Sequence, residues 1–98
     1  MDIIKEQDGD VLTIRPNGRL DTVSAPQLEA ELRNSISGVK ELVFDLADLQ
    51  YVSSAGLRVL LSAQKVMNRQ GGMRIRNAND EVREIFEVTG FDEILTIE

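Results

Sequence analysis

The sequence predicts one α/β domain over residues 1–98, with a mixed β-sheet made of an N-terminal hairpin followed by parallel βα units. Segments of β-type residues alternate with segments that repeat apolar residues at helical spacing. An Asp-Gly pair separates the first two β-type segments, which is a hairpin signal. The composition, 42% hydrophobic and 29% charged, suits a chain of 98 residues that folds around one modest core.

The first two strands are expected at residues 3–6 and 11–15, as an antiparallel hairpin joined by residues 7–10. Residues 16–18, Pro-Asn-Gly, are expected to break the second strand. Residues 19–21 should then form a short extended piece that leads into a turn.

A first helix is predicted after Ser24, which is a plausible N-cap, with Pro26 in the first turn and Gln27 at the capping-box position. Its apolar residues recur at helical spacing: Ala25, Leu28, Leu32 and Ile36. The pair Ser37-Gly38 should end this helix, because glycine commonly follows a helix.

Residues 41–46 form a nearly continuous apolar run, as expected for a strand covered on both faces. The connection over residues 47–52 is ambiguous, since it is too apolar for a free loop. A second helix is predicted from Ser54 to Gln70, ending at Gly71-Gly72, and residues 73–76 alternate like a strand.

The second helix should present two faces. Its polar stripe consists of Arg58, Ser62, Lys65 and Arg69, and its core face of Leu60, Ala63 and Met67. Leu57 and Leu61 fall between these faces, near the serine end. They form either the margin of the core or a small apolar patch that contacts a partner.

Asn79 is expected to cap a third helix, which Gly90 should end. The apolar side of this helix is expected to contain Val82, Ile85, Phe86 and Val88. Residues 94–97 should form a last short strand.

Charge and composition exclude several functions. The net charge of −6 argues against binding to nucleic acid or to an anionic membrane. The chain contains neither Cys nor His, which excludes most zinc sites and catalysis by a Ser-His pair. The first residues do not resemble a signal peptide, and no apolar run approaches the ~20 residues of a membrane span. We therefore expect a soluble, cytoplasmic protein that is not an enzyme and uses no cofactor.

The remaining chemistry lies in Ser53 and Ser54, at the predicted start of the second helix. One of them should cap the helix, which by itself is an ordinary structural role. A phosphate on a serine there would be tolerated, because free N–H groups and the positive end of the helix dipole surround it. Asp45 and Asp48 could form a divalent-cation pair, although such residues more often cap turns, and we predict no metal site.

The stretch from Asp45 to Leu57, Asp-Leu-Ala-Asp-Leu-Gln-Tyr-Val-Ser-Ser-Ala-Gly-Leu, resembles the STAS domain, specifically the bacterial anti-sigma factor antagonists. Weaker matches are residues 18–21, Gly71-Gly72 and residues 82–91, so the resemblance covers essentially the whole chain. Ser53 stands where many members of the family carry Asp. This departure could weaken recognition by a kinase, or offer a second acceptor.

The resemblance implies helices packed mainly on one side of the sheet, and a partner-switching cycle. The unphosphorylated protein would bind an anti-sigma factor that is itself a serine kinase, which frees the sigma factor. Phosphorylation of Ser54 would end that binding, and a PP2C-type phosphatase would restore it. Asp21 would lie near this site, and the chain alone is expected to be a monomer. The expected partner-binding residues are Asp21, Ser53, Ser54, Ala55, Gly56, Leu57, Arg58 and Leu61.

The main alternative is a STAS domain that serves as a docking subunit of a transport or sensory complex, without regulating a sigma factor. A serine hydrolase is a distant third, because no base accompanies Ser54 and the spacing lacks the glycines of a nucleophile elbow.

Overall fold

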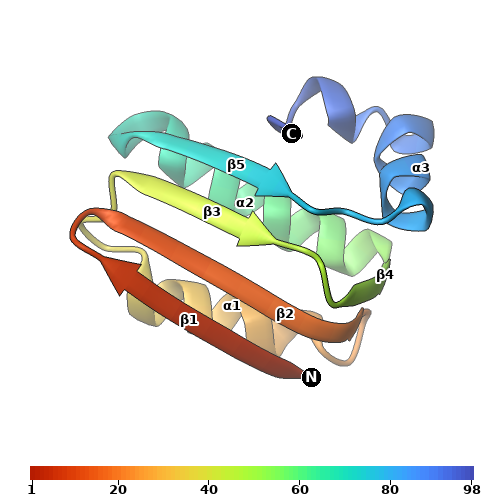
Figure 1. Ribbon diagram of the computed structural model, residues 1–98, viewed down its shortest axis with the longest axis horizontal. Coiled ribbons are helices and arrows are strands. Elements are labelled where there is room, and N and C mark those ends of the chain that lie inside the picture. Colours follow the sequence, from red (N-terminus) through yellow and green to blue (C-terminus); the bar gives the residue numbers. More distant parts are fainter.

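Strands and helices alternate along most of the chain, as the sequence predicts. In chain order the elements are β1 (Asp2–Asp8), β2 (Val11–Leu20), α1 (Ala25–Ser35), β3 (Glu41–Asp45), β4 (Leu49–Val52), α2 (Ser54–Gln70), β5 (Gly72–Arg76), α3 (Asp80–Thr89) and the 3-10 turn η1 (Phe91–Glu93). The computed structural model describes every residue from 1 to 98 (Figure 1).

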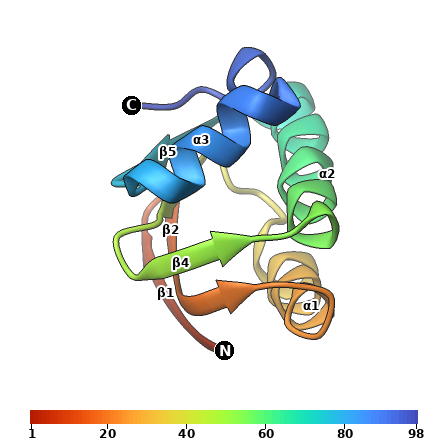
Figure 2. The same ribbon diagram turned by 90° about the vertical axis from the view of Figure 1, so that its right-hand side faces the viewer.

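The sheet is mixed, which confirms the predicted fold class. Strands β1 and β2 form the antiparallel hairpin, and β2, β3 and β5 continue the sheet in parallel pairs in the order β1-β2-β3-β5. Strand β4 pairs in parallel with the C-terminal part of β2, at Gly18 to Leu20. The ends of β2 and β4 therefore lie side by side, and the chain passes from β4 directly into α2 (Figure 2).

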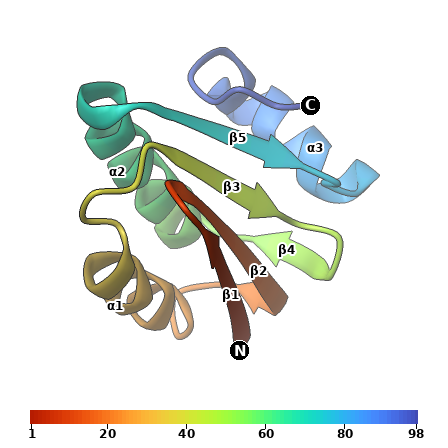
Figure 3. The same cartoon turned by 60° about the vertical axis from the view of Figure 1, so that its left-hand side comes forward.

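Helices α1 and α2 cover one face of the sheet and leave the other face without a helix (Figures 1 and 3). The core between these layers contains alternate residues of the strands, such as Ile14 and Phe44, and Leu28 and Leu60 from the two helices. All four are fully buried. Helix α3 packs beside β4 and contributes Val82 and Phe86 to the same core. The apolar patterns predicted for the first two helices are confirmed, although Ile36 is only partly buried.

Asp45, at the end of β3, accepts hydrogen bonds from three other residues on the helix-free side of the sheet. Its Oδ2 accepts a bond from Arg15 Nε at 3.2 Å, and its Oδ1 accepts bonds from Asn77 Nδ2 at 3.0 Å and from the Ala47 N–H at 3.2 Å. Burial raises the pKa of this carboxyl, but the donors and the nearby charge of Arg76 outweigh burial and hold the pKa below its ordinary value. This carboxylate is therefore engaged in structural bonds rather than free to bind a cation with Asp48.

Strand β2 does not break at Pro16, contrary to expectation, and continues to Leu20. Pairing with β3 ends at Ile14, whereas pairing with β4 begins at Gly18, so Pro16 falls between the two partners. Its missing N–H therefore costs no bond on that side of the strand. The pairing with β4 shifts register between Gly18 and Arg19, which accommodates the glycine.

The connection over residues 47–52, which the sequence left ambiguous, is ordered and contains a true strand, β4, of four residues. Two other local expectations were wrong. Residues 94–97 form no strand; the chain turns through η1 and makes a single bridge between Ile97 and Ile75. Val88 is 80% exposed and does not belong to the apolar side of α3.

The caps also differ between helices. Asn79 caps α3 as predicted, and its side chain accepts the Val82 N–H at 2.8 Å. Ser24 precedes α1 but makes no side-chain cap bond, and Gln27 donates to the Met1 carbonyl at 2.8 Å instead of completing a capping box. Helix α1 ends at Ser35, slightly before the predicted Ser37-Gly38.

Candidate functional site

The two adjacent serines have different structural roles. Ser53 is the N-cap of α2, with an extended backbone (φ −90°, ψ 176°), and its Oγ accepts the Gly56 N–H at 3.3 Å. Ser54 is the first residue of the helix, as predicted, and it is exposed. Its hydroxyl makes no hydrogen bond to any other part of the chain. One serine thus holds the helix and the other is free.

The pairing of β2 with β4 brings Asp21 to this site. Leu20 is the register partner of Val52, and the Ser53 N–H donates to the Leu20 carbonyl at 2.8 Å. Asp21 and Ser53 are the next residues of the two parallel strands, so both chains leave the sheet at the same edge.

The carboxylate of Asp21 shapes the loop beside the site. Its Oδ1 accepts the backbone N–H groups of Val23 and Ser24, each at 3.0 Å. The Ser24 hydroxyl in turn donates to the Arg19 carbonyl at 2.6 Å. The pKa of Asp21 is held below its ordinary value, mainly by the Ser24 N–H, against the effect of burial. The loop therefore carries a fixed negative charge near Ser54 at neutral pH.

Gly56 allows the first turn of α2 to lie directly on these strands. A Cβ at this position would be 2.6 Å from Leu20 Cγ and 2.9 Å from Val52 Cγ2, closer than real contacts allow. The glycine is therefore required by close packing, and it sets the depth at which the helix start sits on the sheet.

The expected partner-binding residues do not all lie on the surface. Ser54 and Arg58 are exposed, and a second set is partly exposed: Asp21, Ser53, Ala55 and Leu61. Gly56 and Leu57 are buried, with Leu57 only 5% exposed. These two therefore lie beneath the surface that Ser54 and Arg58 form, and Leu57 belongs to the core rather than to an apolar patch.

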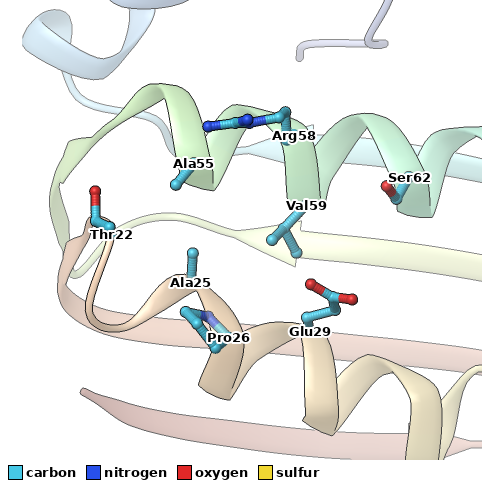
Figure 4. Close-up of a pocket in the computed structure, with 8 residues that line it drawn as sticks. All are labelled: Thr22, Ala25, Pro26, Glu29, Ala55, Arg58, Val59 and Ser62. Atoms are coloured by element: carbon cyan, nitrogen blue, oxygen red, sulfur yellow. The ribbon is translucent and has the colours of Figure 1, made fainter.

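A shallow groove of about 230 Å³ runs between α1 and α2 beside this surface (Figure 4). Ala55 and Arg58 line it from α2, and Glu29 faces it from α1. Figure 4 shows the side chain of Arg58 directed along the helix toward Ala55, and therefore toward the start of α2. This direction is typical of helical side chains, which lean toward the N-terminus.

Two features of the site escaped sequence reasoning. Val23, at the tip of the Asp21 loop, is 87% exposed. Its signal was weak: a single apolar residue between the polar residues Thr22 and Ser24. The Arg19 guanidinium lies 4.4 Å from the ring centroid of Tyr51, its partner in the β2–β4 pairing. This contact fastens together the strands that carry the site.

The two serines lack the neighbouring groups that metal-assisted or nucleophilic catalysis would use. No group of three or more His, Cys, Asp or Glu side chains is placed to hold a metal ion. Neither serine has a basic partner that would activate it as a nucleophile. None of the helices combines the length and hydrophobicity required to cross a membrane.

Comparisons with known sequences identify the family of the chain. The STAS domain family matches residues 2–98. The anti-sigma-B factor antagonist of Listeria monocytogenes is 34% identical, over 96% of this chain and 84% of the relative. The anti-sigma-B factor antagonist of Bacillus subtilis is 28% identical, over 96% and 86%. A Bordetella bronchiseptica protein designated BtrV is 42% identical over an alignment of 82 positions, which covers 82% of this chain and 71% of that protein.

Solved structures share the fold. An anti-sigma factor antagonist from Mycobacterium paratuberculosis superposes with a TM-score of 0.89 at 23% identity, covering 98% of this chain and 83% of its own. The unphosphorylated form of the anti-sigma factor antagonist SpoIIAA gives a TM-score of 0.84 at 20% identity, over 99% and 88%. At this level of identity the likeness establishes the architecture, including the helices on one side of a mixed sheet.

Proposed function

Because the chain belongs to the STAS-domain family and is similar to anti-sigma factor antagonists, we propose that it is a cytoplasmic anti-sigma factor antagonist switched by phosphorylation of Ser54. In the unphosphorylated state it binds an anti-sigma factor that is also a serine kinase. Transfer of phosphate from ATP to Ser54 ends the binding, and a PP2C-type phosphatase removes the phosphate. The protein itself performs no catalysis.

The observation that carries this proposal is the exposed hydroxyl of Ser54, which no other group of the chain engages. A kinase can reach it without unfolding the helix. Ser53 is the weaker acceptor, because its Oγ caps α2 through the Gly56 N–H. The side chain of Ser53 is also less exposed than that of Ser54.

The switch needs only local charge. A phosphate adds roughly −1.5 to −2 charges at neutral pH. Helix N-termini tolerate anions, so the fold is retained. In a docked interface that excludes water, however, an unpaired phosphate costs several kcal/mol. Since ~1.4 kcal/mol changes affinity tenfold, even part of this penalty is enough to release a partner.

Mass spectrometry after incubation with a candidate anti-sigma factor kinase and ATP tests the proposal. We expect one added phosphate, localised to Ser54 by fragmentation. The variant Ser54→Ala should take up none, whereas Ser53→Ala should still be modified. Phosphorylation elsewhere, or stable binding with no phosphate transfer, would instead favour a docking subunit of another complex.

A further inference from the structure

Helix α2 is positively charged, although the chain as a whole is negatively charged. The chain has a net charge of −6, yet α2 contains three basic residues, Arg58, Lys65 and Arg69, and no acidic one. At 100° per residue these three lie with Ser54 and Ser62 within a sector of about 80°. All five are exposed. They form the basic stripe of α2, which begins at Ser54 and extends roughly 22 Å along the helix.

The basic residues of the stripe have no acidic partner within the chain. None of the ion pairs involves Arg58, Lys65 or Arg69. Glu29 lines the same groove as Arg58, but its carboxylate is paired with Arg33 of its own helix. By contrast, most arginines elsewhere in the chain pair with carboxylates, such as Arg15 with Asp45 and Arg74 with Glu41.

Helix stability does not account for the basic side chain at Arg58. Basic residues stabilise the C-terminal turn of a helix, where Arg69 lies, and acidic residues stabilise the first turn. Helix α3 follows this pattern with Asp80 and Glu81 in its first turn, whereas α2 has no acid there. Arg58 lies just after the first turn of α2 and points toward it (Figure 4), so the start of this helix is more positive than helix stability requires.

We infer that the basic stripe of α2 is a docking surface for an acidic face of the anti-sigma factor, so that carboxylates of the partner meet Arg58, Lys65 and Arg69. This inference rests on the proposed function and names the chemistry of the partner. It also gives the phosphate on Ser54 a local target. Residues 54 and 58 are neighbours at i,i+4 spacing, so the phosphate competes with the partner's carboxylates for Arg58.

Calorimetric titration of the anti-sigma factor kinase at 50 and 500 mM NaCl tests the inference. The variant carrying Arg58→Gln, Lys65→Gln and Arg69→Gln should bind at least tenfold more weakly than the natural chain at low salt. This ratio should shrink at high salt, because salt screens exposed charges. A control outside the stripe is Arg74→Gln on the helix-free face of the sheet, which removes one basic charge and should bind within twofold of the natural chain. Circular dichroism should show the same helix content in all variants.

Equal affinities of the triple variant and the natural chain at 50 mM NaCl would overturn the inference. So would an affinity ratio that does not change with salt, since that result indicates lost packing rather than lost charge. Either result leaves the proposed function intact if Ser54 is still phosphorylated. If the natural chain neither binds the kinase nor accepts phosphate, the proposed function itself fails, and the docking surface fails with it.

Discussion

The Ser53 N–H donates to the Leu20 carbonyl at 2.8 Å, which joins the end of β4 to the end of β2. Together with the β2–β4 pairing, this bond holds the start of α2 beside the Asp21 loop. The exposed Ser54 hydroxyl and the Asp21 carboxylate come from segments more than thirty residues apart in sequence. They share one edge of the sheet because β2 and β4 are parallel partners.

We expect Gly56→Ala to destabilise the fold. The added methyl group would meet Leu20 and Val52 at distances below 3.0 Å, so the first turn of α2 must move away from the sheet. Overpacking of this kind costs about 1–3 kcal/mol in the free energy of unfolding, measured in urea. Gly72→Ala is the control, because a Cβ there has nothing within 4 Å. Equal stability of the two variants would show that the helix start is not tightly seated.

Substitutions at the two serines should have different effects on the stability of the fold. Ser53→Ala removes the cap of α2 and should lower the free energy of unfolding by about 1 kcal/mol. Ser53→Asp should retain most of the stability, since Asp is also a good N-cap. Ser54→Ala should change stability by less than about 0.5 kcal/mol, as is usual for surface substitutions. A larger loss at Ser54 than at Ser53 would reverse the assignment of the cap.

The start of α2 was predictable to within a residue because its signals are local. A hydroxyl pair, helical spacing of apolar residues and Gly71-Gly72 at the far end all fall within one segment. Strand β4 was not predictable in this way. Its four residues are too few to show a period, and its pairing depends on the distant Gly18 and Leu20. The prediction that Pro16 breaks β2 was wrong for the same reason. The strand tolerates the proline because Pro16 lies between the residues that pair with β3 and those that pair with β4.

The candidate site was predictable in part. The resemblance pointed to Asp21 and Ser54, and the strand pairing brings their segments together. The burial of Leu57 could not be read from the helical pattern, because its position lies at the boundary of the two faces. The exposure of Val23 depends on the turn that Asp21 makes with the Val23 and Ser24 N–H groups, which sequence alone does not define.

Acid should weaken the fold through Asp45. Its pKa is lower in the folded chain than in the unfolded chain, so the folded state favours the ionised form. The stabilisation is fully present above the unfolded value of about 3.9 and is lost as the pH falls through the folded value. We expect Asp45→Asn to make the free energy of unfolding depend less on pH below about pH 5, measured by urea unfolding at each pH. An unchanged curve would mean that other carboxylates dominate acid unfolding.

A negative charge at position 54 should release the partner without disturbing the fold. Ser54→Asp places a carboxylate at the first position of α2, where the helix dipole favours it, so circular dichroism and thermal stability should match the natural chain. Affinity for the anti-sigma factor kinase should fall at least tenfold in calorimetric titration, because the added charge is desolvated in the interface. Ser37→Asp is the matched control, since Ser37 is exposed in the turn after α1 and the substitution adds the same charge at the opposite end of α2 from Ser54. If Ser54→Asp binds the kinase as tightly as the natural chain does, Ser54 lies outside the interface. Phosphorylation of Ser54 would then have to act through a conformational change.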